Sequence, residues 1–214
     1  MTAAEPPLVA VYADESCRGN GRTGDNPGGG AALIEYVDQR TGTMRRRDLW
    51  LSEPATTNNR MALRSAIEVF RALRARKGSV FRVRFTSDSE YLVKGAKEWI
   101  HGWAARGWRK KAGEVANLQL WQELCDASEP HECEWRWVRG HGGHPQNSYA
   151  DHLATRAADD QANSGGLVRS AFAEWLIEER ARGQVTVAPD PFPVEAEFRA
   201  SRKLPSTPSG RLMG

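Results

Sequence analysis

The sequence predicts a mixed α/β sheet covered by helices. Short apolar runs with alternating character indicate strands, and longer segments with apolar residues at helical spacing indicate helices. Their order is three strands, a helix, a strand, helices, a strand and a helix, which is typical of a single sheet flanked by helices. A chain of 214 residues, 40% hydrophobic and 27% charged, is long enough for one core of ordinary size and too short for two full domains.

The first three strands lie before residue 52. The apolar run 8–13 predicts a strand that ends at Asp14. The glycine-rich stretch 19–30 predicts a loop, after which the chain resumes as a strand over 31–36. Alternation over 43–51 predicts a third strand with arginines on its solvent face.

The first helix is predicted over 58–76, because Leu63, Ile67 and Phe70 recur at helical spacing. Thr57 or Asn58 can cap it. The remaining expected elements are a strand over 80–85 that runs toward Asp88, helical segments at 89–105 and 114–128, a strand over 134–138, and helices over 147–161 and 169–182.

Composition narrows the class of protein further. No apolar run approaches the roughly 18 residues that a membrane span needs, and the first residues lack the pattern of a signal peptide. Three cysteines without a C-x-x-C pair predict neither a disulfide framework nor a zinc site. We therefore expect a cytoplasmic protein without membrane contacts, and a monomer.

Domain boundaries follow from changes in composition. We expect a flexible N-terminus over 1–7, a catalytic domain over 8–162, an additional helix within 163–182, and a mobile tail over 183–214. The tail holds five of the 11 prolines with serine, threonine and glycine between them, a composition that buries little.

Three aspartates are placed where they can form a site. Asp14 and Asp88 end strands, and Asp151 lies in the first turn of a later helix. Taken singly, such an aspartate is more often a cap or a loop residue. Carboxylates gathered from distant parts of a chain repel one another unless a cation neutralises them, and hard oxygen ligands suit Mg²⁺ or Mn²⁺.

Five blocks of residues accompany these aspartates: Asp14 to Asn20, Thr56 to Met61, Thr86 to Ser89, Trp99 to Trp103, and Gly140 to Pro145 followed by Asn147 and Asp151. In this order and spacing they resemble type 1 ribonuclease H over residues 8–160. The resemblance implies a ribonuclease H-like fold with a mixed five-stranded sheet. It also implies two Mg²⁺ ions, with Mn²⁺ as a substitute, and hydrolysis of the RNA strand of an RNA–DNA hybrid.

The resemblance also implies roles for individual residues. Asp14 resembles the aspartate shared by both metals, Asp88 and Asp151 resemble further metal ligands, and His141 matches a mobile-loop histidine that moves protons or helps product leave. A histidine with a pKa near neutrality suits that task. The candidate substrate contacts are Asn20, Asn59 and Glu90 at the hybrid's minor groove and Thr57 at its phosphate pocket, and Asn58 is a further candidate substrate contact.

A basic, tryptophan-rich stretch resembles the family's substrate-binding protrusion. Its candidate contacts are Lys97, Trp99, Trp103, Arg106, Trp108, Arg109 and Lys110. Cationic side chains there would contact the DNA backbone without reading sequence. The alternative is that the tryptophans form a packed face and the charges its solvated rim; both can hold together.

One departure from the family pattern concerns the site itself. Ala62 stands where the family has an active-site glutamate, and Glu15 stands where the family usually has glycine. Consecutive strand residues point to opposite faces, so Glu15 should point away from Asp14 unless the chain has already left the strand.

Three explanations of Ala62 remain open. Glu15 takes over as the missing catalytic and metal-binding carboxylate; or three carboxylates and a water suffice, more weakly; or the protein binds hybrids without cutting them. We expect an endoribonuclease, with a hybrid-binding protein of lost or weakened activity as the alternative. A related nuclease acting on other duplexes is a third reading, which the Asn and Thr residues at the 2′-hydroxyl positions disfavour.

Overall fold

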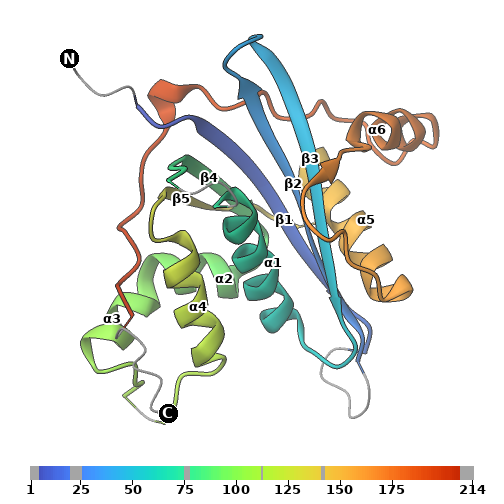
Figure 1. Ribbon diagram of the computed structural model, residues 1–214. Coiled ribbons are helices and arrows are strands. Elements are labelled where there is room, and N and C mark those ends of the chain that lie inside the picture. Colours follow the sequence, from blue (N-terminus) through green and yellow to red (C-terminus); the bar gives the residue numbers. More distant parts are fainter. Residues whose placement is uncertain (1–4, 20–25, 75–77, 112, 141–142, 208–214) are drawn as a thin grey trace.

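The computed structural model describes residues 5–19, 26–74, 78–111, 113–140 and 143–207. Its centre is a six-stranded mixed sheet in the order β5-β4-β1-β2-β3-β6 (Figure 1). β1, β2 and β3 are antiparallel neighbours, β4 and β5 run parallel to β1, and β6 is antiparallel to β3. The bounds are β1 Leu8–Cys17, β2 Gly28–Asp38, β3 Thr43–Glu53, β4 Arg82–Ser87, β5 Glu132–Trp137 and β6 Val168–Arg169.

All five expected strands are present, and β6 is an addition. It has two residues and comes from the segment that we expected to hold an additional helix beyond the catalytic domain. Because β6 pairs with Arg47 and Asp48 of β3, the chain after α5 is tied to the sheet.

Helices cover both faces of the sheet. α1, α2, α3 and α4 lie on one side, and α5 and α6 lie on the other (Figure 1). The bounds are α1 Asn58–Leu73, α2 Glu90–Lys94, a π-helical turn Gly95–Trp99, α3 Ile100–Ala105, α4 Leu118–Ser128, α5 Pro145–Asp160 and α6 Phe172–Ala181. No helix in these described ranges is both long and apolar enough to cross a membrane.

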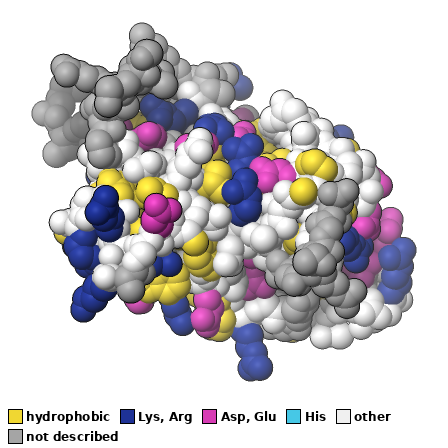
Figure 2. Space-filling model, turned by 90° about the horizontal axis from the view of Figure 1, so that it is seen from below, with side chains coloured by type: hydrophobic (Ala, Val, Ile, Leu, Met, Phe, Trp, Pro, Cys, Tyr) yellow, Lys and Arg dark blue, Asp and Glu magenta, His cyan; other side chains and the backbone are white. Residues whose placement is uncertain are grey.

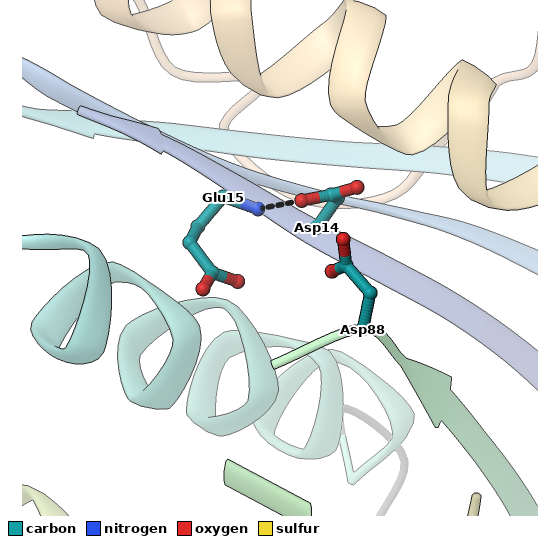
Figure 3. A group of neighbouring side chains, drawn as sticks. All are labelled: Asp14, Glu15 and Asp88. Atoms are coloured by element: carbon teal, nitrogen blue, oxygen red, sulfur yellow. Dashed lines mark hydrogen bonds between the residues drawn. The ribbon is translucent and has the colours of Figure 1, made fainter. Parts of the chain in front are cut away.

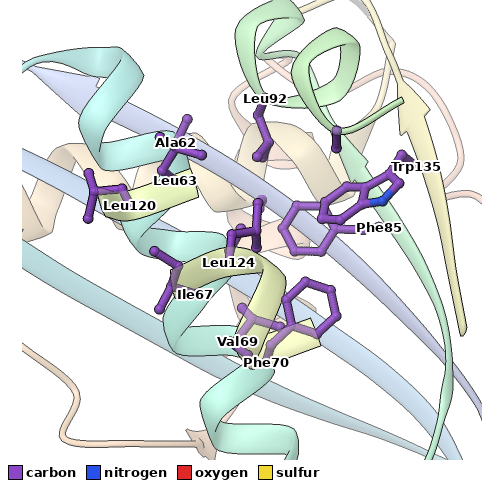
Figure 4. Packing of buried hydrophobic residues seen from close by; sticks show 14 of the residues in the cluster. Ala62, Leu63, Ile67, Val69, Phe70, Phe85, Leu92, Leu120, Leu124 and Trp135 are labelled. Atoms are coloured by element: carbon purple, nitrogen blue, oxygen red, sulfur yellow. The ribbon is translucent and has the colours of Figure 1, made fainter. Parts of the chain in front are cut away.

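The alternation of β1 divides the core in two. Val9, Val11 and Ala13 belong to the larger buried cluster, which α1 and α4 complete (Figure 4). Ala10 and Tyr12 belong to a second cluster beneath α5 and α6. The same alternation decides which layer each residue at the end of β1 enters.

The glycines at the start of β2 were wrongly expected to be loop. Residues 20–25 lie outside the described residues, but Gly28, Gly29 and Gly30 are paired strand residues. A Cβ on Gly29 would lie 2.0 Å from the backbone oxygen of Ala154 in α5. Glycine here therefore allows a helix to approach the sheet closely, a role that composition does not distinguish from loop flexibility.

The segment after α6, which we predicted to be a mobile tail that buries little, is mostly exposed in the structure but contacts the sheet at defined points. Residues 183–207 run from α6 across the sheet to β5 and α4 (Figure 1). Arg84 donates to the backbone oxygen of Glu197 at 3.1 Å. Ser201 donates its backbone N–H to Cys133 at 2.8 Å and accepts from the backbone N–H of Trp135 through its hydroxyl. Backbone pairing with the outer edge of β5 supplies partners that a free tail would lack.

Candidate active site

Three carboxylates meet where β4 ends beside β1. Asp14, Glu15 and Asp88 each place an oxygen within 4.8 Å of the others (Figure 3). Ala13 of β1 is level with Ser87 of the parallel strand β4, so the aspartate that follows each residue emerges at the same edge. This is the meeting of Asp14 and Asp88 that we predicted.

Glu15 joins this group although it leaves the other face of β1. The strand continues to Cys17, and Figure 3 shows the Glu15 side chain directed toward α1 while Asp14 lies toward α5. Asp88 follows the last residue of β4, and its carboxylate lies close to both. Glu15 therefore points away from Asp14, as face alternation predicts, but its long side chain still brings the carboxylate within reach of the other two.

Ala62 lies in the layer that Glu15 enters. Its side chain is 1% exposed and belongs to the same buried cluster as Ala13, the residue of β1 that shares a face with Glu15. A carboxylate entering from α1 and one entering from β1 would therefore converge on the same layer.

Two hydrogen bonds hold the carboxylate of Asp14. The backbone N–H of Glu15 donates to Oδ1 at 2.7 Å, and Nδ2 of Asn147 donates to Oδ2 at 2.8 Å. Asn147 is the third residue of α5, so this helix reaches the site with its first turn. Asn147 belongs to the family blocks in the sequence, but only its contact with Asp14 in the structure gives it a role.

Crowding of carboxylates changes their acidity. Burial raises the pKa of Asp14 to about 9, and the nearby charges of Asp88, Glu15 and Asp151 add to the rise. Burial likewise raises the pKa of Glu15 to about 8, with Asp88 and Asp151 adding to it and a hydrogen bond with the Ser89 side chain opposing it. A bound cation would relieve this repulsion, and a set of carboxylate oxygens suits a hard divalent ion.

Asp151 stands one helical turn after Asn147, on the same face of α5. It lies close enough to raise the pKa values of Asp14 and Glu15, although it is not part of the 4.8 Å group. The structure therefore brings all four predicted carboxylates to one region. The other two predicted residues near the site, His141 and Asn20, lie outside the described residues.

The end of β5 cradles Asp88. Nε1 of Trp137 donates to the backbone oxygen of Asp88 at 2.9 Å. A Cβ on Gly140 would lie 2.2 Å from Oδ2 of Asp88, so a side chain at position 140 would displace this carboxylate. Neither contact with Asp88 has a signature in local spacing, so the sequence did not predict these roles for Trp137 and Gly140.

The N-terminus of α1 carries the predicted phosphate-pocket residues. Thr57 is the N-cap, and its hydroxyl accepts a hydrogen bond from the backbone N–H of Arg60. Asn58 and Asn59 form the first turn, and Thr57 and Asn59 are exposed. Glu90, at the start of α2, is exposed and pairs with Lys94 at 2.8 Å.

The tryptophans of the basic stretch have different environments. Trp99 is 37% exposed, whereas Trp103 and Trp108 are 7% exposed and belong to the core cluster. Trp103 packs edge-on against Trp121 of α4. We predicted that Trp103 and Trp108 contact substrate. Their burial in the core cluster removes the ring faces from solvent and favours the alternative, a packed face.

The cations around these tryptophans are exposed. Lys97, Arg106, Arg109 and Lys110 all lie at the surface. Figure 2, which views the molecule from below, shows lysine and arginine side chains standing out at several points, with acidic and apolar side chains between them. The packed face and the charged rim therefore coexist.

A mixed sheet flanked by helices, with a carboxylate cluster where β4 ends beside β1, is typical of a metal-dependent nuclease of ribonuclease H-like fold. The chain belongs to the RNase H family, whose model matches residues 6–159. It is 43% identical over 155 residues to the Ribonuclease H of Chromohalobacter salexigens, covering 72% of this chain and 86% of that protein. It is 44% identical over 150 residues to the Ribonuclease H of Cupriavidus metallidurans, covering 69% of this chain and 93% of that protein.

A solved structure resembles this chain beyond the family domain. It is LC9-RNase H1, described as "a type 1 RNase H with the type 2 active-site motif", with a TM-score of 0.89 and 55% sequence identity. The match covers 98% of this chain and 99% of that one, so it includes most of the segment after residue 162. A foamy viral protease-reverse transcriptase in complex with an RNA/DNA hybrid shares the fold, with a TM-score of 0.55 and 14% identity.

Proposed function

We propose that this protein is an endoribonuclease that hydrolyses the RNA strand of RNA–DNA hybrids, with Asp14, Glu15, Asp88 and Asp151 as its metal-binding carboxylates. The observation that carries the proposal is the convergence of carboxylate oxygens from Asp14, Glu15 and Asp88 within 4.8 Å. Membership of the RNase H family supports the substrate class.

The proposed cofactor is a pair of Mg²⁺ ions, with Mn²⁺ as a substitute. Bound at these carboxylates, two such ions would supply an activated water and would stabilise the leaving oxygen in phosphodiester hydrolysis. The protein's own contribution is to hold the ligands. Asn147 and the backbone of Glu15 fix both oxygens of Asp14, and Trp137 fixes the backbone of Asp88. His141 is the proposed proton carrier.

We propose further that Glu15 takes the place of the active-site glutamate that the family has at the position of Ala62. Both positions face the layer between β1 and α1, and Glu15 already lies with Asp14 and Asp88. LC9-RNase H1 is described as combining a type 1 enzyme with the type 2 motif. In this chain the sequence departs from the type 1 pattern at Glu15, directly after Asp14. This departure is consistent with a type 1 enzyme that carries a different active-site motif.

The proposed substrate surface joins the site to the exposed cations. Thr57, Asn58 and Asn59 lie at the N-terminus of α1, and the N-terminus of a helix favours phosphate. Asn20 and Glu90 are the other proposed minor-groove contacts. The cations Lys97, Arg106, Arg109 and Lys110, with Trp99, are proposed to hold the DNA strand. A cytoplasmic monomer remains the proposed state of the protein.

Cleavage of a hybrid with labelled RNA, in Mg²⁺ and separately in Mn²⁺, tests the proposal. We expect cutting within the RNA strand, abolished by Asp88→Asn, and little inhibition by double-stranded DNA. Tight hybrid binding by the wild type without cutting in either ion would support the alternative, a hybrid-binding protein with a lost active site. Cutting of double-stranded DNA would indicate a different nuclease.

A further inference from the structure

We propose that the segment after α6 positions the first turn of α5, and with it the Asn147 amide that holds Asp14, through hydrogen bonds between the buried Gln146 side chain and the backbone of Asp190. The inference rests on the proposed function, because it gives a part in catalysis to two residues outside the carboxylate site. It assigns them a positioning role.

The link is a reciprocal pair of hydrogen bonds. Nε2 of Gln146 donates to the backbone oxygen of Asp190 at 2.8 Å, and the backbone N–H of Asp190 donates to Oε1 of Gln146 at 3.1 Å. Gln146 is 0% exposed, and its amide also hydrogen-bonds the buried side chain of Glu35 in β2. A buried amide with its partners satisfied favours one arrangement, because any shift leaves polar groups unpaired.

The side chain of Asp190 adds a second contact to the same turn. Its Oδ2 lies 3.2 Å from Nδ1 of His144, the residue at the N-cap position of α5. His144 makes no side-chain capping bond to the helix, so this contact ties the cap position to the segment after α6. Phe192, two residues further on, packs against the buried cluster beneath α5.

The link is close in the chain to the site. Asn147 directly follows Gln146, and its amide donates to Asp14 at 2.8 Å. Asp151 lies one turn later on the same helix. Displacement of the first turn of α5 would therefore move the partner of Asp14 first, and small misplacements at a catalytic site reduce turnover more than substrate binding.

The test uses the full chain and three variants. Gln146→Met keeps the length of the side chain and removes the amide; Asp190→Ala keeps the backbone link and removes the contact with His144. Lys203→Ala is the control, since Lys203 belongs to the same segment and pairs with exposed Glu129, away from the site. Each variant is measured well below its own melting temperature, with kcat and KM for a hybrid and the Mg²⁺ dissociation constant by calorimetry.

For Gln146→Met we expect kcat to fall about tenfold and the Mg²⁺ dissociation constant to rise several-fold. Substitution of residues that hold metal ligands in place typically has effects of about this size. KM should stay within about twofold of the wild-type value. Asp190→Ala should shift kcat and Mg²⁺ affinity in the same direction, by about threefold. Lys203→Ala should match the wild type.

A folded Gln146→Met variant with wild-type kcat and Mg²⁺ affinity would overturn the proposal, even if its melting temperature falls. If that variant does not fold, Asp190→Ala decides, and unchanged kcat and Mg²⁺ affinity would overturn it equally. Failure of the proposed function is a separate result, because the wild type itself would then leave the hybrid intact.

Discussion

At the scale of single residues, the site depends on which carboxylate occupies the layer between β1 and α1. Glu15 enters it from the strand, and Ala62 faces it from the helix. A glutamate at both positions would bring another negative charge to a region where burial and like charges already raise the pKa of Glu15. Charge repulsion therefore favours a glutamate at only one of the two positions, 15 or 62.

A charge-exchange experiment tests whether the two positions are equivalent. We expect Glu15→Gln to reduce hybrid cleavage about a thousandfold or more, as loss of a metal ligand removes several kcal/mol of transition-state stabilisation. Adding Ala62→Glu to Glu15→Gln should restore at least tenfold. Cleavage rates of both variants, with the Ala62→Glu single variant as reference, measure the coupling. Near wild-type cutting by Glu15→Gln would mean that three carboxylates suffice.

His131 provides a prediction for pH. It is buried between Phe70 and Phe81, and its Nδ1 accepts a hydrogen bond from the backbone N–H of Phe81. Burial lowers its pKa from 6.5 to about 4, and Arg74 adds to the decrease. The unfolded chain therefore takes up the proton first as the pH falls.

The contribution of neutral His131 to stability is complete above pH 6.5 and is lost between pH 6.5 and about 4. We expect a loss of about 2 kcal/mol, allowing for partial screening. His131→Asn offers an oxygen acceptor that does not titrate. The difference in unfolding free energy between the wild type and this variant should therefore shrink as the pH falls from 6.5 to about 4. Urea unfolding at several pH values measures it, and parallel curves would contradict the assignment.

At the scale of elements, close packing of α5 on β2 depends on glycine. A Cβ on Gly29 would lie 2.0 Å from a backbone oxygen and 2.7 Å from a backbone nitrogen of α5, neither of which can move like a flexible side chain. We expect Gly29→Ala to destabilise the protein by about 3 kcal/mol through overpacking. Gly102→Ala in α3 is the matched control, because its Cβ would meet only the end of the Arg106 side chain. Thermal unfolding of the two variants should therefore differ widely; equal melting temperatures would contradict the packing argument.

The basic stretch gives a second prediction at this scale. Lys97→Ala with Arg109→Ala should weaken hybrid binding and reduce its salt dependence, with the melting temperature nearly unchanged, because both cations are exposed. Trp103→Ala should instead lower stability by about 3 kcal/mol, as expected for a buried aromatic residue. Binding titrations at several salt concentrations and thermal unfolding separate the two effects. A cation variant with an unchanged salt slope would remove these residues from the substrate surface.

At the scale of the whole molecule, the segment after residue 162 completes the domain. β6 extends the sheet beside β3, and Ser201 pairs with β5 at the opposite edge. β3 and β5 are therefore each partly covered by the same stretch of chain, which limits the exposed edges on which strands of other chains can add. The match to LC9-RNase H1 over 98% of this chain extends across the same region.

Local pattern was sufficient for the five main strands and for the aspartates at their ends. The side-chain period of a strand and the apolar spacing of α1 are written in neighbouring residues, and parallel strands bring their ends to one edge. Asp14 and Asp88 could therefore be placed together from the sequence. The family blocks added Asp151, which lies near enough to affect Asp14.

Tertiary packing decided the rest. Glu15 and Asp14 leave opposite faces of the sheet, but their carboxylates both lie near that of Asp88 because the glutamate side chain is long. Trp103 and Trp108 are buried, and the glycines of β2 are strand, because of helices distant in the chain. By itself the sequence determined the ribonuclease H-like fold and its carboxylates. Contacts between segments far apart, which have no local period, decided which residues complete the site and where the C-terminal segment lies.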